Sequence, residues 1–275
     1  MTGPPGGPRL DPDTIARLAP LAASPGDTAV LTDFDGTLAP IVEDPTAVRA
    51  LPGAIEVLNR LVVAYAVVAV VSGRPVSFLG ERLAGTSGVR LIGLYGLEQV
   101  DASGALVEVP EAERWRPAVT GVVERLRAVA PDGAWIESKG LTVTTHWRKV
   151  PGWAAEAEAL VAAEASATGL VPHVGRMSLE LRPPVDVDKG TVVAALAAGH
   201  RAACFLGDDF GDLPAFAALG RLASEAGVAA VSVAAVDAES APEVEAAAAV
   251  SVPGPEGALA VLRWLADAAD GGWGR

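Results

Sequence analysis

The sequence predicts an α/β protein with a Rossmannoid core and a parallel sheet, interrupted by a smaller α+β unit. Three observations lead to this prediction. Apolar runs alternate with helical patterns over residues 11–100, and the alternation returns over residues 185–275. Between these segments, residues 101–184 read as helix, two strands, helix and two strands, which favours an antiparallel sheet. Residues 1–10 form a Gly/Pro-rich tail that we expect to be disordered.

In the first core segment, capping residues and apolar spacing justify the individual elements. Asp11 directly precedes Pro12, a pairing that favours a helix start. Ile55, Leu58 and Leu61 recur at helical spacing, whereas residues 66–71 are all small or β-branched, as in a buried central strand. The expected elements are, in order, helix 11–21, strand 29–31, helix 52–64, strand 66–71, helix 75–83 and strand 89–94.

The inserted segment begins with a polar hairpin signal at residues 101–104. Its further elements are expected to be helix 111–129, strands 134–137 and 141–147, helix 153–168, and strands 170–174 and 177–181. The core pattern then resumes with helix 188–198, strand 202–206, helix 213–219, strand 228–233 and helix 256–268. The Ala/Glu-rich residues 238–250 read as a surface loop or a short helix.

Composition excludes several classes of protein. The chain has 275 residues, 51% of them hydrophobic, enough for one large domain or two of ordinary size. A formal charge of −13 argues against a nucleic acid or an anionic membrane surface as a partner. The longest apolar run, residues 61–71, is too short to span a bilayer, and the amino terminus lacks the apolar core of a signal peptide. We therefore expect a cytoplasmic, monomeric protein whose partner is a small molecule.

Polar clusters follow three of the predicted core strands, and the carboxyl ends of parallel strands meet at one edge of a sheet. Asp33 and Asp35 follow strand 29–31, and Gly36 allows the chain to turn there. Once this loop curls, one aspartate can present its carboxylate and the other its carbonyl to a single ion. Taken alone, the pair fits an Asp-rich turn equally well.

The other clusters supply groups for an anion and for a metal. Ser72 and Gly73, in a turn that enters a helix, can hold phosphate oxygens because helix N-termini carry partial positive charge. Lys189 supplies a point cation for the same anion. Hard oxygen ligands of the kind that Mg²⁺ prefers come from Asp208, Asp209 and Asp212. Each cluster alone also fits a helix cap, a surface turn or a loop, but all four together favour a phosphate site.

The order of these clusters resembles the haloacid dehalogenase (HAD) superfamily of phosphohydrolases. Its pattern D-F-D-G-T, S-G-R, K-G and G-D-D-x-x-D begins here at Asp33, Ser72, Lys189 and Gly207. The fuller sequence, from about residue 29 to 265, is similar to the trehalose-6-phosphate phosphatase family within that superfamily. The narrower likeness rests on residues 33–41, 44–45, 96–98, 137–141, 146–148 and 179–183.

The resemblance implies a HAD-like fold with a C2-type cap, and Mg²⁺-dependent hydrolysis of a sugar phosphate, trehalose 6-phosphate. Asp33 would form an aspartyl-phosphate, and Asp35 would act first as acid and then as base. The implied Mg²⁺ ligands are Asp33, the Asp35 carbonyl and Asp208, supported by Asp209 or Asp212. The implied phosphate-holding residues are Ser72, Gly73 and Lys189.

The same resemblance implies that the inserted segment closes over the sugar and recognises its hydroxyl groups. The candidates at the rim and in the cap are Arg74, Tyr95, Glu137, Lys139, His146, Arg148, Arg176 and Glu180. On alternating strands, Arg148 or Arg176 fits a plain solvated face as well.

At two positions the sequence departs from the pattern typical of this family. Tyr95 stands where histidine is usual, and Gly211 stands where threonine is usual. These departures concern the sugar rather than the phosphatase chemistry. A related phosphorylated disaccharide or an aminocyclitol pseudo-sugar is therefore an alternative substrate. A third hypothesis is an inactive sugar-phosphate-binding module, which predicts the loss of Asp33 or Asp35, and both are present.

Overall fold

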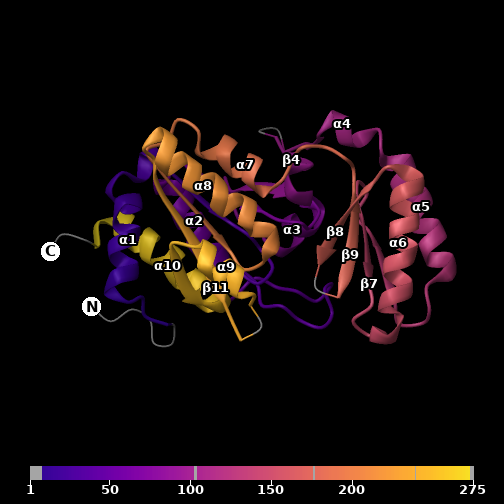
Figure 1. Cartoon of the computed structure of the whole chain (residues 1–275). Coiled ribbons are helices and arrows are strands. Elements are labelled where there is room, and N and C mark those ends of the chain that lie inside the picture. Colours follow the sequence, from indigo (N-terminus) through magenta and orange to yellow (C-terminus); the bar gives the residue numbers. More distant parts are fainter. Residues whose placement is uncertain (1–7, 102–103, 176, 239, 273–275) are drawn as a thin grey trace. The chain divides into compact units, whose positions relative to one another are not determined.

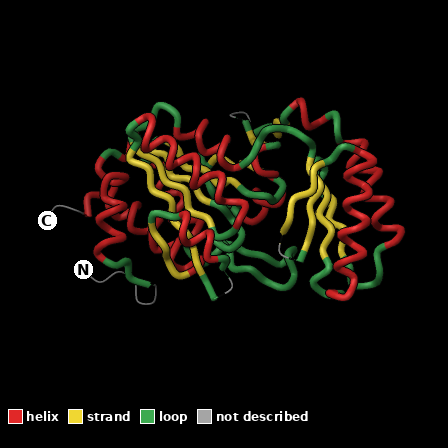
Figure 2. The backbone as a smooth tube through the Cα atoms, viewed as in Figure 1, coloured by secondary structure: helices red, strands yellow, loops and turns green. Residues whose placement is uncertain are grey.

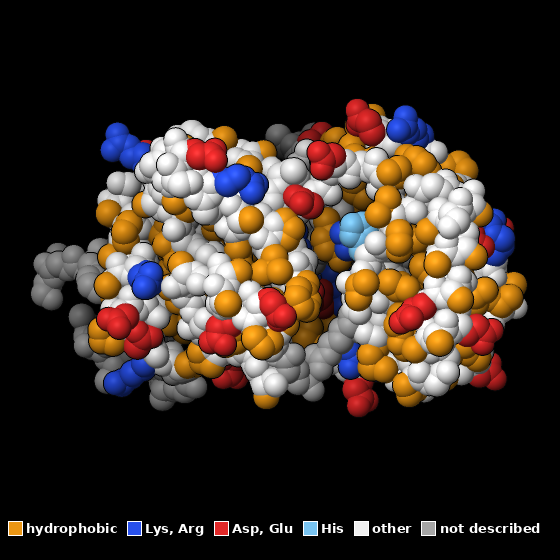
Figure 3. All heavy atoms as spheres, in the orientation of Figure 1, with side chains coloured by type: hydrophobic (Ala, Val, Ile, Leu, Met, Phe, Trp, Pro, Cys, Tyr) orange, Lys and Arg blue, Asp and Glu red, His pale blue; other side chains and the backbone are white. Residues whose placement is uncertain are grey.

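The computed structural model describes residues 8–101, 104–175, 177–238 and 240–272 (Figure 1). They divide into a core unit, Met1–Val100 with Val187–Arg275, and an inserted unit, Asp101–Asp186. Among the described residues, no helix has both the length and the apolar character needed to cross a membrane. On the face drawn in Figure 3, Lys and Arg side chains lie singly rather than gathered in one basic patch. The first seven residues of the predicted tail lie outside the described residues.

The core sheet is mostly parallel, with β1 (Thr28–Thr32) near its centre. Within the core unit the strand order is β12-β11-β10-β1-β2-β3-β4, and every neighbouring pair is parallel except β3–β4. All five residues of β1 are buried, because helices cover both faces of a central parallel strand. The remaining strands are β2 (Val67–Val71), β3 (Arg90–Gly93), β4 (Glu98–Val100), β10 (Ala202–Gly207), β11 (Ala229–Val236) and β12 (Val250–Pro253).

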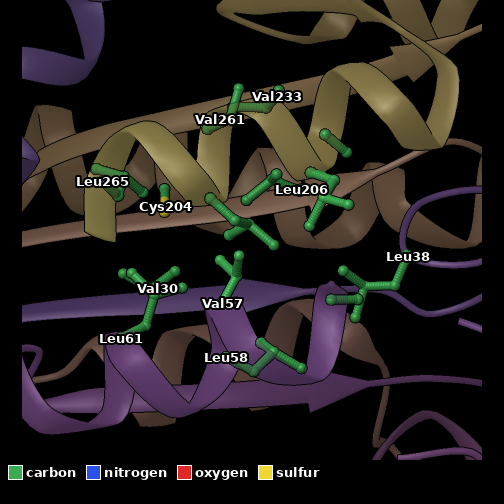
Figure 4. Close-up of a cluster of buried hydrophobic side chains, with 14 of the residues drawn as sticks. Val30, Leu38, Val57, Leu58, Leu61, Cys204, Leu206, Val233, Val261 and Leu265 are labelled. Carbon is green, nitrogen blue, oxygen red and sulfur yellow. The ribbon is translucent and has the colours of Figure 1, made fainter. Parts of the chain in front are cut away.

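Two layers of helices enclose this sheet (Figure 2). Side chains alternate along β1, so that Val30 joins the hydrophobic cluster on one face and Leu31 the cluster on the other. Figure 4 shows the first cluster, in which Val30 lies among side chains that include Leu61 and Leu265. That face is covered by α1 (Pro12–Ala23), α2 (Ala54–Ala64) and α10 (Gly254–Asp267). The other face carries α7 (Lys189–Ala197), α8 (Leu213–Ala226) and α9 (Pro242–Ala247), and α3 (Val76–Arg82) follows β2.

The inserted unit has a four-stranded antiparallel sheet in the order β6-β7-β9-β8. Its two long helices lie on one face of that sheet (Figure 2), where Val119 and Val161 pack with Val143 and Leu181. The helices are α4 (Pro110–Glu113), α5 (Arg116–Val129) and α6 (Ala154–Thr168). The strands of this sheet are β6 (Trp135–Ser138), β7 (Val143–His146), β8 (Val171–Gly175) and β9 (Ser178–Arg182). The unit also contains the short strand β5 (Leu106–Glu108), which is not part of this sheet.

Three details differ from the sequence-based expectation. The predicted helix 111–129 is divided into α4 and α5, because Pro117 in the first turn of α5 has no N–H and prevents a continuous helix. Helix α8 continues past the predicted end at Leu219 to Gly227, which adopts the left-handed C-cap conformation (φ 67°). The segment 238–250 contains the short helix α9, but it also leads into β12, an edge strand that was not predicted. The α/β class and the parallel core sheet are confirmed.

Candidate active site

Asp33 lies at the carboxyl end of the central strand β1. Its backbone N–H donates to the carbonyl of Leu206 on β10 (2.8 Å), which continues the parallel pairing up to this residue. Phe34 is fully buried behind it and meets Phe78 edge to face. Asp33 itself is 4% exposed. A fixed backbone and a buried neighbour therefore hold this carboxylate in one place.

Gly36 brings the loop after Asp33 close to the loop after β10. Its backbone is left-handed (φ 74°), and a Cβ at this position would lie within 2.5 Å of the Asp208 carboxylate. The next residue, Thr37, donates its hydroxyl to Asp208 Oδ1 (3.2 Å). Glycine is thus required both for the turn and for the close approach of Asp208. Thr37 was not predicted as a site residue, although it follows directly on the glycine turn.

Lys189 reaches the same edge of the sheet from the first turn of α7. Asp188 caps this helix by accepting from the Thr191 N–H (2.8 Å). The Lys189 Nζ atom lies 2.9 Å from Asp33 Oδ1 and 2.6 Å from Asp212 Oδ1. Burial acts to lower the pKa of Lys189, but Asp212 and Asp33 outweigh it and hold that pKa well above its ordinary value. Lys189 is therefore a buried permanent cation.

The aspartates after β10 have different roles. Asp212 is fully buried, and its Oδ2 accepts from the N–H groups of Asp208 (2.8 Å) and Asp209 (3.2 Å). Asp209 caps the short 3₁₀ turn 210–212 through the Gly211 N–H. One oxygen each of Asp33, Asp208 and Asp212 lies within 4.8 Å of the others, and Asp209 is not part of this group.

This group carries more negative charge than its surroundings balance. Burial raises the pKa of Asp33 well above its ordinary value, an effect that Lys189 opposes and Asp212 reinforces. Burial, followed by the charges of Asp209 and Asp212, also raises the pKa of Asp208. Asp33 Oδ1 is buried and accepts no hydrogen bond from any described residue, although Lys189 Nζ lies nearby. The arrangement suits a further cation held by hard oxygen ligands.

Asp35 is held by Arg74 on the neighbouring loop. Arg74 donates from Nε to Asp35 Oδ2 and from Nη2 to Asp35 Oδ1, both at 2.8 Å. The guanidinium also lies over the ring of Phe78, 4.6 Å from its centroid. The Asp35 carboxylate is thus paired with Arg74 and is not one of the three clustered aspartates. Arg74, which we predicted at the substrate rim, is engaged with Asp35.

The turn that carries Ser72 is braced by the segment after β3. Ser72 is buried, and its Oγ accepts from the Arg74 N–H (3.2 Å). The backbone N–H of Val76, at the start of α3, donates to the buried carboxylate of Glu98. Glu98 lies in a segment that carried the family resemblance, but its support of this turn was not predicted.

In the inserted unit, one face of the sheet carries a row of polar side chains. Residues paired directly across antiparallel strands share a face. The register pairs Glu137 with Thr144, Thr144 with Glu180, and Glu180 with His173. The apolar Ile136, Val143 and Leu181 alternate with this row and face the helices instead. The sequence therefore separates an apolar face that packs from a polar face that can bind.

Two groups of side chains in hydrogen-bond contact stand on this polar face. His146 Nε2 lies 3.0 Å from Glu137 Oε2, and the imidazole stacks on Trp135 with centroids 4.6 Å apart. Glu180 accepts from Lys139 Nζ (3.1 Å) and from the Thr142 hydroxyl (2.7 Å). Four of the predicted recognition residues are thus brought together: Glu137, Lys139, His146 and Glu180.

One further predicted residue of this unit, Arg148, does not join the cluster. Arg148 lies beyond the end of β7 and is exposed, and Arg176 lies outside the described residues. Conversely, Arg182 donates to Glu180 (Nη2–Oε2 2.8 Å) and was not predicted. Its position two residues after Glu180 on one strand, hence on the same face, was the available signal. Trp135, two residues before Glu137, carries the same signal.

The ion pairs of Glu180 predict a pH-dependent stability. Burial opposes ionisation, but Lys139 and Arg182 outweigh it and lower the pKa of Glu180 from 4.5 to about 2. The stabilisation is fully present above pH 4.5 and is lost as the pH falls towards 2. Glu180→Gln should therefore lower the free energy of unfolding by about 3 kcal/mol at pH 7 and by much less at about pH 3.

Urea unfolding followed by tryptophan fluorescence measures this difference. Four of the six tryptophans lie in the inserted unit, so the signal reports mainly on it. An equal loss of stability at both pH values would mean that the charge of Glu180 is not responsible.

Comparison with known proteins identifies the family. The trehalose-phosphatase family model matches residues 31–252, which include both aspartate loops, Ser72 and Lys189. The chain belongs to the trehalose-phosphatase family. It is 34% identical over 207 residues to the trehalose-phosphate phosphatase of Mycobacterium marinum, covering 70% of this chain and 51% of that one. It is 35% identical over 201 residues to the trehalose-phosphate phosphatase of Mycolicibacterium paratuberculosis, with the same coverage. This trehalose-phosphatase family member thus spans about half the length of the curated relatives it matches.

Solved structures of the family share the fold. The trehalose-6-phosphate phosphatase of Aspergillus fumigatus matches with a TM-score of 0.64 and 25% identity, covering 95% of this chain and 99% of that one. The C-terminal domain of the trehalose-6-phosphate phosphatase of Candida albicans matches with a TM-score of 0.74 and 23% identity, covering 95% and 98%. The HAD-like fold predicted for this trehalose-phosphatase family member is therefore confirmed.

Proposed function

We propose that this chain is an Mg²⁺-dependent phosphatase that converts trehalose 6-phosphate to trehalose and phosphate through an aspartyl-phosphate on Asp33. One observation carries the proposal: a buried carboxylate at the end of the central strand lies beside a permanent buried cation, Lys189, and two further aspartates. The names of the curated relatives supply the substrate.

In the first step, an Asp33 oxygen attacks phosphorus and the bond from phosphorus to the sugar oxygen breaks. Asp35 gives its proton to the departing oxygen. In the second step, Asp35 takes a proton from water, the water oxygen attacks phosphorus, and the Asp33 carboxylate is released. Lys189 and the turn at Ser72 hold the transferring oxygens throughout. Arg74 holds the Asp35 carboxylate in position through two hydrogen bonds, and this pairing must weaken when Asp35 takes up the proton.

The donor set fits Mg²⁺. Asp33, Asp208 and Asp212 offer hard oxygen atoms close together, and Asp33 Oδ1 accepts no hydrogen bond among the described residues. Asp33 and Asp208 would hold the ion, with the carbonyl of Asp35. Asp212 already accepts from Lys189 and two backbone N–H groups, so its support is indirect. Mg²⁺ bound there would offset the repulsion between a carboxylate and a phosphate dianion.

The polar face of the inserted unit supports recognition of sugar hydroxyl groups. Glu137 and Glu180 are acceptors, and Lys139 and Arg182 are donors, on one face of one sheet. Such a mixture matches a disaccharide, whose hydroxyl groups both donate and accept. We propose that this unit is the cap of the enzyme.

Two observations support a second class of substrate as an alternative. Tyr95 and Gly211 replace the residues typical of the family, and both lie beside the candidate phosphate site. A related phosphorylated disaccharide or an aminocyclitol pseudo-sugar phosphate is the alternative. An inactive binding module is disfavoured, because Asp33, Asp35 and Lys189 are all present and Lys189 Nζ lies 2.9 Å from Asp33 Oδ1.

A substrate panel tests the proposed function. Phosphate release with Mg²⁺ should be measured for trehalose 6-phosphate, glucose 6-phosphate, sucrose 6-phosphate and a phosphorylated aminocyclitol. We expect trehalose 6-phosphate to have the highest kcat/KM. Equal turnover of glucose 6-phosphate contradicts the trehalose assignment, and preference for another member of the panel supports the alternative. No hydrolysis of any member, with Mg²⁺ present, contradicts phosphatase activity.

Removal of the metal should abolish activity and lower stability. Chelation with EDTA is expected to reduce phosphate release to background, and Mg²⁺ to restore it. Mg²⁺ should also raise Tm, because it binds the folded carboxylates and relieves their repulsion. Asp208→Asn should remove most of that Tm increase. An unchanged Tm together with full activity in EDTA would refute the metal proposal.

A further inference from the structure

Tyr95 has an unusual backbone beside the candidate phosphate site. Leu94 and Tyr95 are consecutive non-glycine residues with left-handed backbones, at φ 48° and φ 63°. Hydrogen bonds hold both of them: Leu94 N–H donates to the Arg74 carbonyl (3.0 Å), and Tyr95 N–H donates to the Ser72 carbonyl (2.9 Å). Such strain persists where the surrounding structure enforces it, and it collects at functional sites. Backbone hydrogen bonds thus connect the strained residues Leu94 and Tyr95 to the turn that carries Ser72.

The Tyr95 side chain lies against that turn. A Cβ added at Gly73 would lie 2.5 Å from Tyr95 Cζ, so no side chain fits there while the phenol is in place. The phenol therefore packs directly on the backbone between Ser72 and Arg74. Tyr95 brings an aromatic ring and a hydroxyl group to the turn that we assign to phosphate oxygens.

The same ring approaches the aspartate loop from the other side. A Cβ added at Gly211 would lie 3.6 Å from Tyr95 Cε1, an ordinary contact, and 3.0 Å from Asp209 Oδ1. A residue at 211 with atoms beyond Cβ would compete with the ring for space. Lys189 Nζ is 5.9 Å from the centroid of the ring and 2.9 Å from Asp33. Tyr95 thus lies between two loops of the site, near its buried cation.

We propose that Tyr95 determines which alcohol can lie beside the transferring phosphate, and that the absence of side-chain atoms beyond Cβ at position 211 leaves room for its ring. This inference rests on the proposed phosphatase function and deepens it. The ring limits the width of the site next to the Ser72 turn, and the hydroxyl group supplies a donor and an acceptor for a polyhydroxy substrate. Tyr95 is a specificity-determining residue rather than a catalytic one.

A double-mutant cycle tests the match between residues 95 and 211. The proteins are full-length wild type, Tyr95→His, Gly211→Thr and the double variant. Gly211→Thr is expected to lower kcat/KM for trehalose 6-phosphate about tenfold or more with Tyr95, but less than about threefold with histidine at 95. Gly211→Ala is the matched control, because its Cβ meets Asp209 and only touches the ring. Threonine at 211 contacts Asp209 whether residue 95 is tyrosine or histidine, so this contribution cancels when the two backgrounds are compared.

Thermal unfolding gives the cycle a readout that does not depend on activity. The fall in Tm caused by Gly211→Thr should be larger with Tyr95 than with histidine at 95. Additive effects on both kcat/KM and Tm would overturn the matched pair.

Substrate selectivity separates a specificity role from a structural one. In Tyr95→His and Tyr95→Phe, the ratio of kcat/KM for trehalose 6-phosphate to kcat/KM for p-nitrophenyl phosphate should change about tenfold relative to wild type. Equal losses for both substrates would overturn the specificity role. If wild type hydrolyses p-nitrophenyl phosphate but not trehalose 6-phosphate, the proposed substrate is wrong. The role of Tyr95 is then tested by comparing the selectivity of wild type and the Tyr95 variants across the sugar-phosphate panel.

Discussion

Asp33→Asn is expected to lower kcat for trehalose 6-phosphate by about 10³-fold or more, because an amide oxygen cannot replace the carboxylate as nucleophile. The fold should remain. The substitution keeps the shape of the side chain and removes a buried charge, and Lys189 retains its contact with Asp212 (2.6 Å). Phosphate release with saturating Mg²⁺ measures the activity, and circular dichroism with thermal unfolding measures the fold.

Asp132→Asn is the matched control for this experiment. Asp132 lies exposed in the turn before β6, so the same chemical change there should leave kcat and Tm within experimental error. Activity of Asp33→Asn equal to that of Asp132→Asn would refute Asp33 as the nucleophile.

Lys189→Met is expected to abolish turnover and also to destabilise the protein. Lys189 is 2% exposed and lies within 3 Å of two carboxylates, so its removal leaves buried negative charges without their cation. Breaking a buried ion pair by removing one partner lowers the free energy of unfolding by about 3–5 kcal/mol. Urea unfolding in EDTA measures this loss, and the loss should shrink when Mg²⁺ is added, because the ion neutralises the same carboxylates.

Lys149→Met provides the control. Lys149 is exposed, and an exposed lysine contributes little to stability. If Lys189→Met proved as stable and as active as Lys149→Met, the buried cation would have neither the structural nor the catalytic importance assigned to it.

The main features of the fold could be predicted because they depend on local patterns. The buried run of β1 and the β-branched run of β2 identified central strands, and glycine, proline and aspartate marked where elements begin and end. The prediction was wrong where one type of residue is compatible with more than one structure. The predicted helix 213–219 ends before Gly220, but α8 continues through it, because a Cβ there would meet open space and glycine is tolerated. Pro117, by contrast, divided a helix that the apolar spacing alone made continuous.

The sequence predicted which residues form the candidate site better than it predicted which of them pair with one another. The topology of a parallel sheet brings the loops after β1, β2 and β10 to one edge, and the structure has Asp33, Ser72 and Asp208 there. The pairing of Arg74 with Asp35, and of Lys189 with Asp212, depends on loop curvature and side-chain rotamers, which spacing does not encode. The position of Tyr95 between Gly73 and Gly211 has the same origin.

The most direct test is whether the phosphoryl group passes through Asp33. Enzyme in excess over trehalose 6-phosphate should be quenched in acid during a single turnover, reduced with borohydride, digested and analysed by mass spectrometry. An aspartyl-phosphate is reduced to homoserine, so we predict homoserine at position 33 at early times and its disappearance as phosphate is released. Homoserine at another position would contradict the mechanism. So would unmodified Asp33 at every time, if phosphate is released with inversion at phosphorus, as a single displacement requires.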